Sequence, residues 1–250
     1  MLETIRNAWK IPEIRKKILF TLFIILVFRV GSVIPVPFVD PSVIKEMSAA
    51  GTNDFFSYLS ILTGGGLQYG AIFAMSVTPY INASIIIQLL SVAIKPLERL
   101  AQQGEEGRKK IAQITRYATI ILGLIQGTAY FFYLKNNSCL SVTGGTVVFA
   151  AFVIILCFTA GSALVMWLGE QITDKGFGQG VSVIIFAGII ASIPGAISQV
   201  YQDKFVNIRP GEMMGSVIFV IILLIAMAAI IYITTYIQQA ERKIPIQYTK

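Results

Sequence analysis

Few side chains in this chain could do chemistry, and they lie in stretches that are otherwise apolar. The 250 residues include no His, so a Ser-His-Asp triad, a His metal site and an imidazole proton relay are excluded. Arg29 is the main ionisable residue inside an apolar stretch, and a buried Arg is a functional candidate by default. Its place near the end of that stretch favours the alternative, a side chain that reaches toward water at the interface. No Asp or Glu lies mid-stretch, so a carboxylate relay is not expected.

One stripe of residues recurs at intervals of four and three, the spacing of a single helix face. It consists of Val77, Ile81, Ser84, Gln88 and Ser91. The stripe begins with branched aliphatic residues and ends with polar ones, so it could line a pore in which an apolar constriction opens into a wet vestibule. Hydrogen bonding between membrane helices is the alternative, and spacing alone favours it. Val181 and Ile185 repeat the aliphatic part, one helical turn apart.

The glycine patterns favour packing over nucleotide binding. The glycine-rich run 176–180 precedes an apolar helix and does not complete a strand–loop–helix unit, so a tight turn is the better interpretation. Two further pairs have the spacing that permits close helix contacts: Gly123 with Gly127, and Gly211 with Gly215. There is no Walker A loop and no zinc motif, and Ser nucleophiles lack a base. We expect no catalysis and no cofactor.

The composition indicates a membrane protein. Apolar residues make up 55% and charged residues 13%, about half the ~25% charged share of a soluble domain. A span needs about 20 mostly apolar residues, and each must be helical because lipid offers no partner for backbone groups. Six stretches qualify: 18–34, 76–94, 117–134, 146–168, 180–200 and 213–237. Cys139 and Cys157 fall in a polar connection and an apolar span, so a disulfide between them is not expected.

The distribution of Lys and Arg predicts the orientation. Of the 20 basic residues, 15 lie in the N-terminal lead, in alternate connections and at the C-terminal end, which puts both termini in the cytoplasm. The connection 95–116 holds Arg108, Lys109 and Lys110. It sets topology and attracts lipid headgroups in one interpretation, and docks a partner in another.

Two segments depart from simple spans. Within the external connection 35–75, residues 64–75 are apolar, glycine-broken and too short to span. A re-entrant half-helix would fit them, because irregular backbone at membrane depth must be buried in protein or line a cavity. A glycine-rich loop on the membrane surface is the alternative. The chain stops at Lys250, soon after the sixth span, and we interpret it as the N-terminal portion of a longer protein built from two halves.

Four strings, in order along the chain, resemble the SecY family of protein-conducting channels. They are 28–37 (FRVGSVIPVP), 78–90 (TPYINASIIIQLL), 104–111 (GEEGRKKI) and 166–178 (MWLGEQITDKGFG). The resemblance covers essentially the whole chain. It implies an all-α channel of ten helices in two inverted halves, with this chain supplying the first five-helix half and helix six. The implied divisions are a cytoplasmic lead 1–17, the half-channel 18–200, and helix six with the start of a cytoplasmic loop, 201–250.

The resemblance also assigns roles to residues. A hydrophobic pore ring would include Val77, Ile81, Val181 and Ile185. A plug at about 64–75 would seal the closed channel, with Gly64, Gly65, Gly66, Leu67, Ile72 and Phe73 among its residues. Gln88 and Gln126 would belong to a lateral gate through which apolar segments leave. Cytoplasmic partners would contact Arg108, Lys109, Lys110, Arg242 and Lys243.

The implied function is passage of unfolded secretory chains across a bacterial-type plasma membrane, with lateral release of transmembrane segments into the bilayer. The implied partners are SecE-like and SecG-like small membrane subunits, a SecA-like motor ATPase and the ribosome. An aliphatic ring can close around a moving peptide while it resists ion flow by dewetting. Two rival classes are a secondary transporter half, which should carry an ion or substrate site, and an intramembrane enzyme, which lacks a nucleophile–base pair.

Overall fold

The computed structural model describes residues 11–44, 63–142, 144–202 and 213–240. These ranges fold into α-helices and hold no strand, apart from two isolated bridges. The helices are α2 (Pro12–Gly31), α5 (Thr78–Ala93), α6 (Lys95–Gln102), α7 (Glu105–Asn136), α8 (Val147–Lys175), α9 (Gly180–Tyr201) and α10 (Met213–Gln238), with a short 3-10 turn η1 (Gly144–Thr146) before α8.

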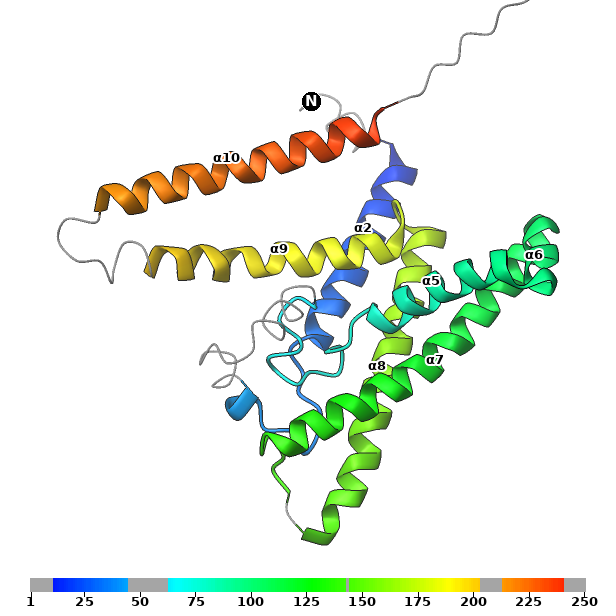
Figure 1. Ribbon diagram of the computed structural model, residues 1–250, viewed down its shortest axis with the longest axis horizontal. Coiled ribbons are helices and arrows are strands. Elements are labelled where there is room, and N and C mark those ends of the chain that lie inside the picture. The colour runs from blue at the N-terminus through cyan, green and yellow to red at the C-terminus, as the bar shows by residue number, and fades with distance from the viewer. Residues whose placement is uncertain (1–10, 45–62, 143, 203–212, 241–250) are drawn as a thin grey trace, which may run out of the picture. The chain divides into compact units, whose positions relative to one another are not determined.

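The chain divides into two compact units, residues 1–192 and 193–250, which are described separately. In the first unit α7 packs along both α5 and α8, and α2 packs on α8 (Figure 1). Residues 63–77, coloured cyan before α5, run beside these helices. The second unit contains the end of α9, with Pro194 inside the helix, and α10. The described side chains of α10 are almost entirely exposed.

Among the described helices, four are long and apolar enough to cross a membrane: α7, α8, α9 and α10. A fifth span would combine α5 and α6, which meet at a bend of 101°. Each of the six predicted spans overlaps a helix, although α2 is not among the helices that are long and apolar enough by themselves, and several helices have other bounds than predicted. Helix α2 starts six residues earlier than the predicted span, at Pro12, so its first turns include the basic residues 15–17. Helix α5 has only 16 residues because the segment before it forms turns.

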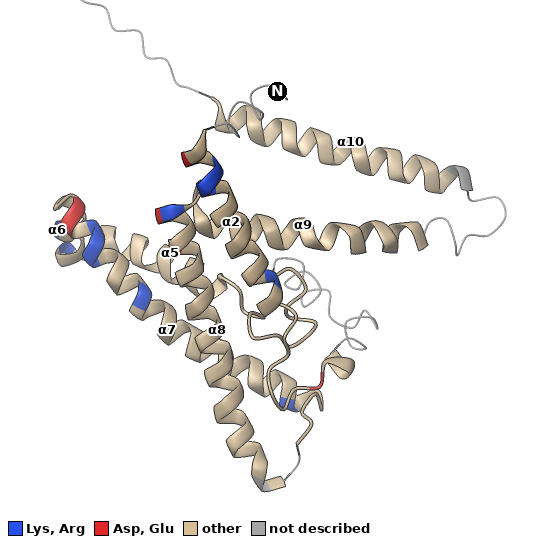
Figure 2. Ribbon diagram, turned by 180° about the vertical axis from the view of Figure 1, so that it is seen from behind, with Lys and Arg blue, Asp and Glu red and all other residues tan. Residues whose placement is uncertain are grey.

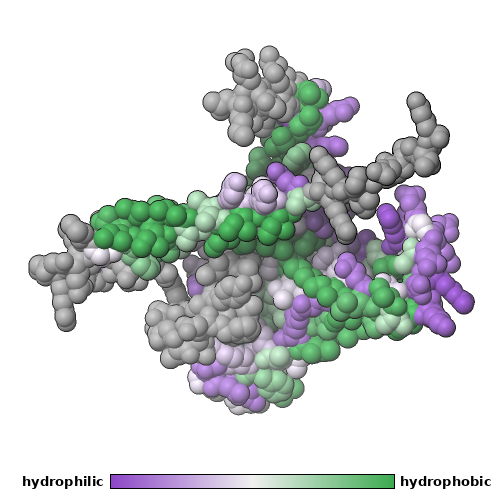
Figure 3. All heavy atoms as spheres, turned by 45° about the horizontal axis from the view of Figure 1, so that its top comes forward, coloured by the Kyte–Doolittle hydropathy of each residue, from purple (hydrophilic) through white to green (hydrophobic). Residues whose placement is uncertain are grey.

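Charged side chains gather at α6, at the start of α7 and in the first turns of α2 (Figure 2). Elsewhere the helices present large apolar side chains outward, which appear as green surface in Figure 3. Tyr117, Ile121 and Ile125 of α7 and Phe149 and Phe152 of α8 are all more than half exposed. Water would not tolerate such a surface, whereas the apolar interior of a bilayer would cover it.

Small residues bring α7 and α8 together, as predicted for the first glycine pair. A Cβ on Gly123 would lie 3.1 Å from the Ser162 hydroxyl, and one on Gly127 would lie 3.6 Å from the Ile155 carbonyl oxygen. Backbone atoms can therefore approach closely across this interface. For the second pair, Gly211 lies outside the described residues, and no atom lies within 4 Å of a Cβ built on Gly215.

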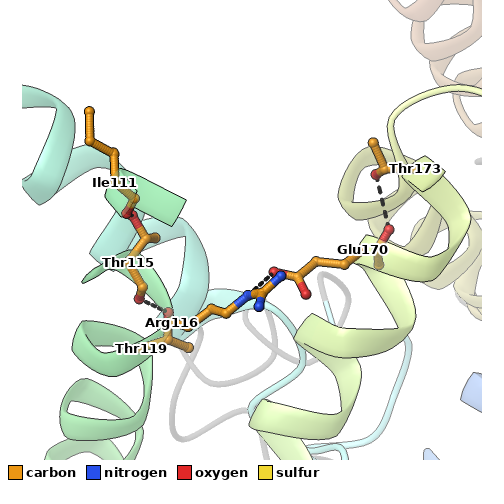
Figure 4. Close-up of polar contacts among 7 residues, drawn as sticks. Ile111, Thr115, Arg116, Thr119, Glu170 and Thr173 are labelled. Atoms are coloured by element: carbon orange, nitrogen blue, oxygen red, sulfur yellow. Dashed lines mark hydrogen bonds and ion pairs between the residues drawn. The ribbon is translucent and has the colours of Figure 1, made fainter. Parts of the chain in front are cut away.

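An ion pair also joins the two helices. The Arg116 guanidinium donates from Nε to the Glu170 carboxylate at 2.8 Å, and Figure 4 shows the two side chains reaching toward each other from α7 and α8. The Arg116 side chain is 49% exposed, so this bridge contributes at most about 1 kcal/mol and mainly fixes the pairing of the two helices.

Both cysteines are free thiols, in agreement with the sequence-based expectation. Cys139 is fully buried just after α7, and its burial, with a smaller effect of the Asp40 charge, raises the pKa of its thiol. A buried, protonated thiol of this kind is chemically inert and serves as a small apolar group.

Candidate functional site

Two buried clusters form the interior of the first unit. The α7–α8 cluster gathers Val36, Val39, Ile44, Leu67, Ala74, Tyr130, Phe131, Leu134, Cys139, Ala150, Ile154 and Phe158. The α8–α9 cluster gathers Ile24, Phe28, Phe73, Val77, Val165, Leu168, Ile172 and Ile184. The second cluster thus joins α2, the start of α5, α8 and the first turns of α9. All its members are apolar, so it presents no charge that would select a particular ligand.

The four residues implied as a pore ring all belong to the α8–α9 cluster or pack against it. Val77 is a buried member, 2% exposed, at the residue that precedes α5. Ile81, Val181 and Ile185 are partly buried and pack against the cluster. The aliphatic half of the stripe and the aliphatic pair on α9 therefore border the same apolar cluster, although the two pairs are about 100 residues apart in the chain. A ring role for these residues stays a prediction.

Residues 63–77, which we call the turn segment, connect to the start of α5. The expected half-helix is a run of turns here. Backbone N–H groups bond three residues back at Gly66, Gln68, Gly70, Ala74 and Ser76. Gly64, Gly65 and Gly70 have positive φ angles of 67°, 87° and 55°, and this left-handed geometry breaks a regular helix.

Backbone hydrogen bonds dock the turn segment on the residues after α2. The Val36 N–H donates to the Gly70 carbonyl at 2.9 Å, and the Ile72 N–H donates to the Ile34 carbonyl at 3.0 Å. Pro35 and Ala71 form an antiparallel bridge between these bonds. Ala71 is fully buried, so this pairing satisfies backbone groups that have no access to water.

Two side chains hold carbonyl groups of the turn segment. Arg29 Nη1 donates to the Gly64 carbonyl at 2.9 Å, and the Tyr130 hydroxyl donates to the Leu67 carbonyl at 3.1 Å. The Phe73 ring stacks on Phe28, with centroids 6.0 Å apart. Arg29 therefore contacts the protein backbone, a third possibility beside the two that its sequence position suggested.

The turn segment also lies in a notch on α8. A Cβ built on Gly161 would come within 2.1 Å of the Ile72 carbonyl oxygen, so only glycine fits at this position. Ile72 packs against both clusters, while Leu67 belongs to one cluster and Phe73 to the other. The segment thus lies between the two clusters, and its last residue, Val77, belongs to the α8–α9 cluster.

This notch leads to a prediction about stability. Gly161→Ala should lower the free energy of unfolding of the full-length protein by about 1–3 kcal/mol, because the added methyl group has no space. Ala otherwise favours a helix over Gly, so destabilisation would isolate the contact. Thermal unfolding in detergent measures it, with Gly195→Ala as the control because no atom of the described residues lies within 4 Å of a Cβ built there. A Gly161→Ala variant as stable as the parent would contradict the close contact between Gly161 and the Ile72 carbonyl.

The polar half of the stripe on α5 is partly buried at Ser84 and Ser91 and exposed at Gln88. The Ser91 hydroxyl donates to the Gln88 carbonyl in its own helix at 2.7 Å, so this residue does not make the interhelical bond that spacing alone favoured. Gln126 is partly buried on α7, the helix that packs against α5. Their implied gate role stays a prediction.

The basic residues implied as partner contacts are only partly within the described ranges. Arg108, Lys109 and Lys110 are exposed in the first turns of α7. Arg242 and Lys243 lie outside the described residues. Sequence reasoning missed Tyr130 and Gly161 as anchors of the turn segment. Their partners are backbone carbonyls far away in the chain, and no spacing pattern announces such contacts.

The helices define a multi-pass membrane protein, and its fold is that of protein-conducting channels. The chain resembles Sec61 in the canine ribosome–channel complex from the endoplasmic reticulum, with a TM-score of 0.63, 19% identity and coverage of 97% of this chain and 54% of that one. It also resembles a structure described as that of a protein-conducting channel, with a TM-score of 0.53 and 19% identity over 80% of this chain and 42% of that one.

The sequence comparisons identify the family. The SecY family model matches residues 71–250. Protein translocase subunit SecY of Lactococcus lactis subsp. cremoris is 45% identical over 99% of this chain, and that of Bacillus subtilis is 46% identical over 100%. The chain belongs to the SecY family. It spans a little over half the length of these relatives, 56% and 57%.

Proposed function

We propose that this chain is the N-terminal part of a protein-conducting channel, with half-channel 18–200 and helix six with the start of a cytoplasmic loop at 201–250. Its relatives are named protein translocase subunits, and translocated polypeptides are therefore the substrate class. One observation carries the proposal above all. Two aliphatic pairs from distant parts of the chain, Val77 with Ile81 and Val181 with Ile185, belong to or pack against one apolar cluster.

The apolar constriction accounts for both passage and sealing. Val77 and the three residues that pack near it offer no charge and no hydrogen-bonding group to a moving peptide, so passage would not depend on its sequence. When nothing passes, the same surfaces exclude water and ions by dewetting. The turn segment, with residues 64–67, Ile72 and Phe73 assigned to it, acts as the plug in this account. Phe73 belongs to the cluster and Ile72 packs against it.

The remaining roles follow from family membership. Gln88 and Gln126 would border the lateral gate, since α5 and α7 pack side by side and Gln88 is exposed. The membrane would be a bacterial-type plasma membrane with both ends of this chain in the cytoplasm, where the basic connections lie. The energy would come from a SecA-like motor or the ribosome, which would contact Arg108, Lys109 and Lys110, and SecE-like and SecG-like subunits would complete the assembly. No chemical step is required of the chain.

Photo-crosslinking at Gln88 tests this function. In the full-length protein, a photoreactive residue at Gln88 should crosslink to the apolar signal segment of a stalled secretory chain. The control is a photoreactive residue at Phe152 of α8, which is 64% exposed on the outward face of the helix. Equal adducts at the two positions would contradict a gate at α5 and α7. An absence of adducts at Gln88 while the chain is engaged would do the same.

A further inference from the structure

The residue that joins the turn segment to α5 is held in an unfavourable state. Ser76 has a φ of 47°, in the left-handed region that residues other than glycine rarely adopt. Its side chain is only 3% exposed, and its hydroxyl has no hydrogen-bond partner among the described residues. Burial without a partner and a left-handed backbone each cost free energy. Both costs fall on one residue, where the turns end and regular helix begins.

Conformational strain of this kind persists only where surrounding contacts hold it in place. The contacts that oppose it lie at the other end of the turn segment. Arg29 donates to the Gly64 carbonyl, twelve residues before Ser76, and a hydrogen bond from a charged donor is stronger than one between neutral groups. A Cβ on Gly64 would lie 2.9 Å from the guanidinium and 3.0 Å from Gly188 of α9, so this turn is fitted closely against both.

Arg29 bonds the turn segment although water is within its reach. The side chain is only partly buried near the end of α2, so it could reach water, yet it bonds a backbone carbonyl of the turn segment. No described carboxylate pairs with it. Among the described residues, this guanidinium therefore bonds a segment that is itself strained at its far end.

We propose that Arg29 is a latch, and Ser76 a strained hinge, for the turn segment. The docked segment then holds conformational strain that undocking would relieve. The Arg29 bond at Gly64 keeps it in place, and the strain at Ser76 favours release once that bond opens. This inference rests on the proposed function for its purpose, because release would uncover the cluster around Val77. Arg29 is a positioning residue in this account and touches no substrate.

Thiol labelling of the full-length protein in lipid vesicles tests the latch. Leu67→Cys, in a chain otherwise free of Cys, places a thiol on the turn segment at a position that is 7% exposed when docked. Arg29→Met should raise the rate of labelling by a water-soluble maleimide about tenfold, because one charge-assisted hydrogen bond is lost. Arg29→Lys keeps a charged donor and should remain within about threefold of the parent.

The hinge predicts the opposite effect. Ser76→Gly removes both the left-handed strain and the buried hydroxyl, so it should lower the labelling rate about fivefold. Ser76→Ala removes only the hydroxyl and should have a smaller effect. The double variant Arg29→Met with Ser76→Gly should return close to the parental rate. A merely structural role for Arg29 would lower thermal stability without this compensation.

An unchanged labelling rate in Arg29→Met would overturn the proposal, as would a rate in Ser76→Gly equal to or above that of the parent. The measurement reports docking of the segment and does not depend on transport. The latch can therefore fail while signal segments still crosslink to Gln88, and it can hold while they do not. Failure of the latch and failure of the proposed function are thus distinguishable.

Discussion

Replacing Ile81 with Lys in the full-length protein should raise resting ion conductance about tenfold or more, and should let chains with weakened signal segments pass. Ile81 packs against the α8–α9 cluster beside Val77, and an ammonium group there has no partner among the apolar members of the cluster. A bias of only about 1.4 kcal/mol against the closed arrangement gives a tenfold change in its population. The surface would also become wettable, which removes the dewetting barrier.

Planar-bilayer recordings of the purified full-length channel measure the conductance, and export of a reporter with a defective signal measures selectivity. Ile81→Leu is the matched control, since it keeps volume and apolarity and should stay near the parent. If Ile81→Lys shows the ion leak and the signal selectivity of the parent, Val77 and Ile81 serve only in helix packing and do not form a constriction.

Deleting residues 64–75 should have the second large effect, a sustained resting leak in a protein that still folds. The deletion removes Leu67, Ile72 and Phe73, and with them the cover that lies between the two clusters. It leaves α2, α5, α7 and α8 intact, so most packing in the first unit is retained. The leak should appear without any translocating chain, as long openings in bilayer recordings.

A deletion of equal length upstream, residues 47–58, is the control, because it shortens the same connection without touching the turn segment. We expect no leak from it. Leak of equal size from both deletions would mean that shortening alone disturbs the channel. A tight channel after removal of 64–75 would end the assignment of this segment as the plug.

Much of the fold was predictable because lipid forces it. Helices α7, α8, α9 and α10 follow from apolar stretches long enough to span, since backbone groups in a bilayer must bond within their own helix. The break before α5 was also predictable, from the glycines at 64–70. The ends of helices were harder. Helix α2 begins at Pro12 and continues through its basic first turns because no Gly or further Pro interrupts the sequence before Gly31.

The form of the turn segment could not be predicted, and the reason is physical. Its path depends on single contacts between residues far apart in sequence, such as Arg29 with Gly64 and Tyr130 with Leu67. Neither contact produces a repeating pattern in the sequence. Both acceptors are backbone carbonyls, which every residue type has, so the residue type at the acceptor position does not indicate the contact. The positive φ of Ser76 runs against local preference, so tertiary contacts must impose it.

The candidate pore ring could be predicted only in part from the sequence. Periodicity placed Val77 and Ile81 on one helix face, and Val181 and Ile185 on another, but it could not say that the two faces meet. The family resemblance supplied that expectation, and the α8–α9 cluster contains or contacts all four residues.

The most direct test is a photoreactive residue at Ile81 of the full-length protein, probed with a secretory chain stalled in transit. We predict abundant adducts between Ile81 and the translocating chain, and none at Ile121, which is 58% exposed on the outward face of α7. No adducts at Ile81, while the chain is demonstrably engaged, would contradict the account, because the moving peptide would then take a path that avoids the aliphatic constriction.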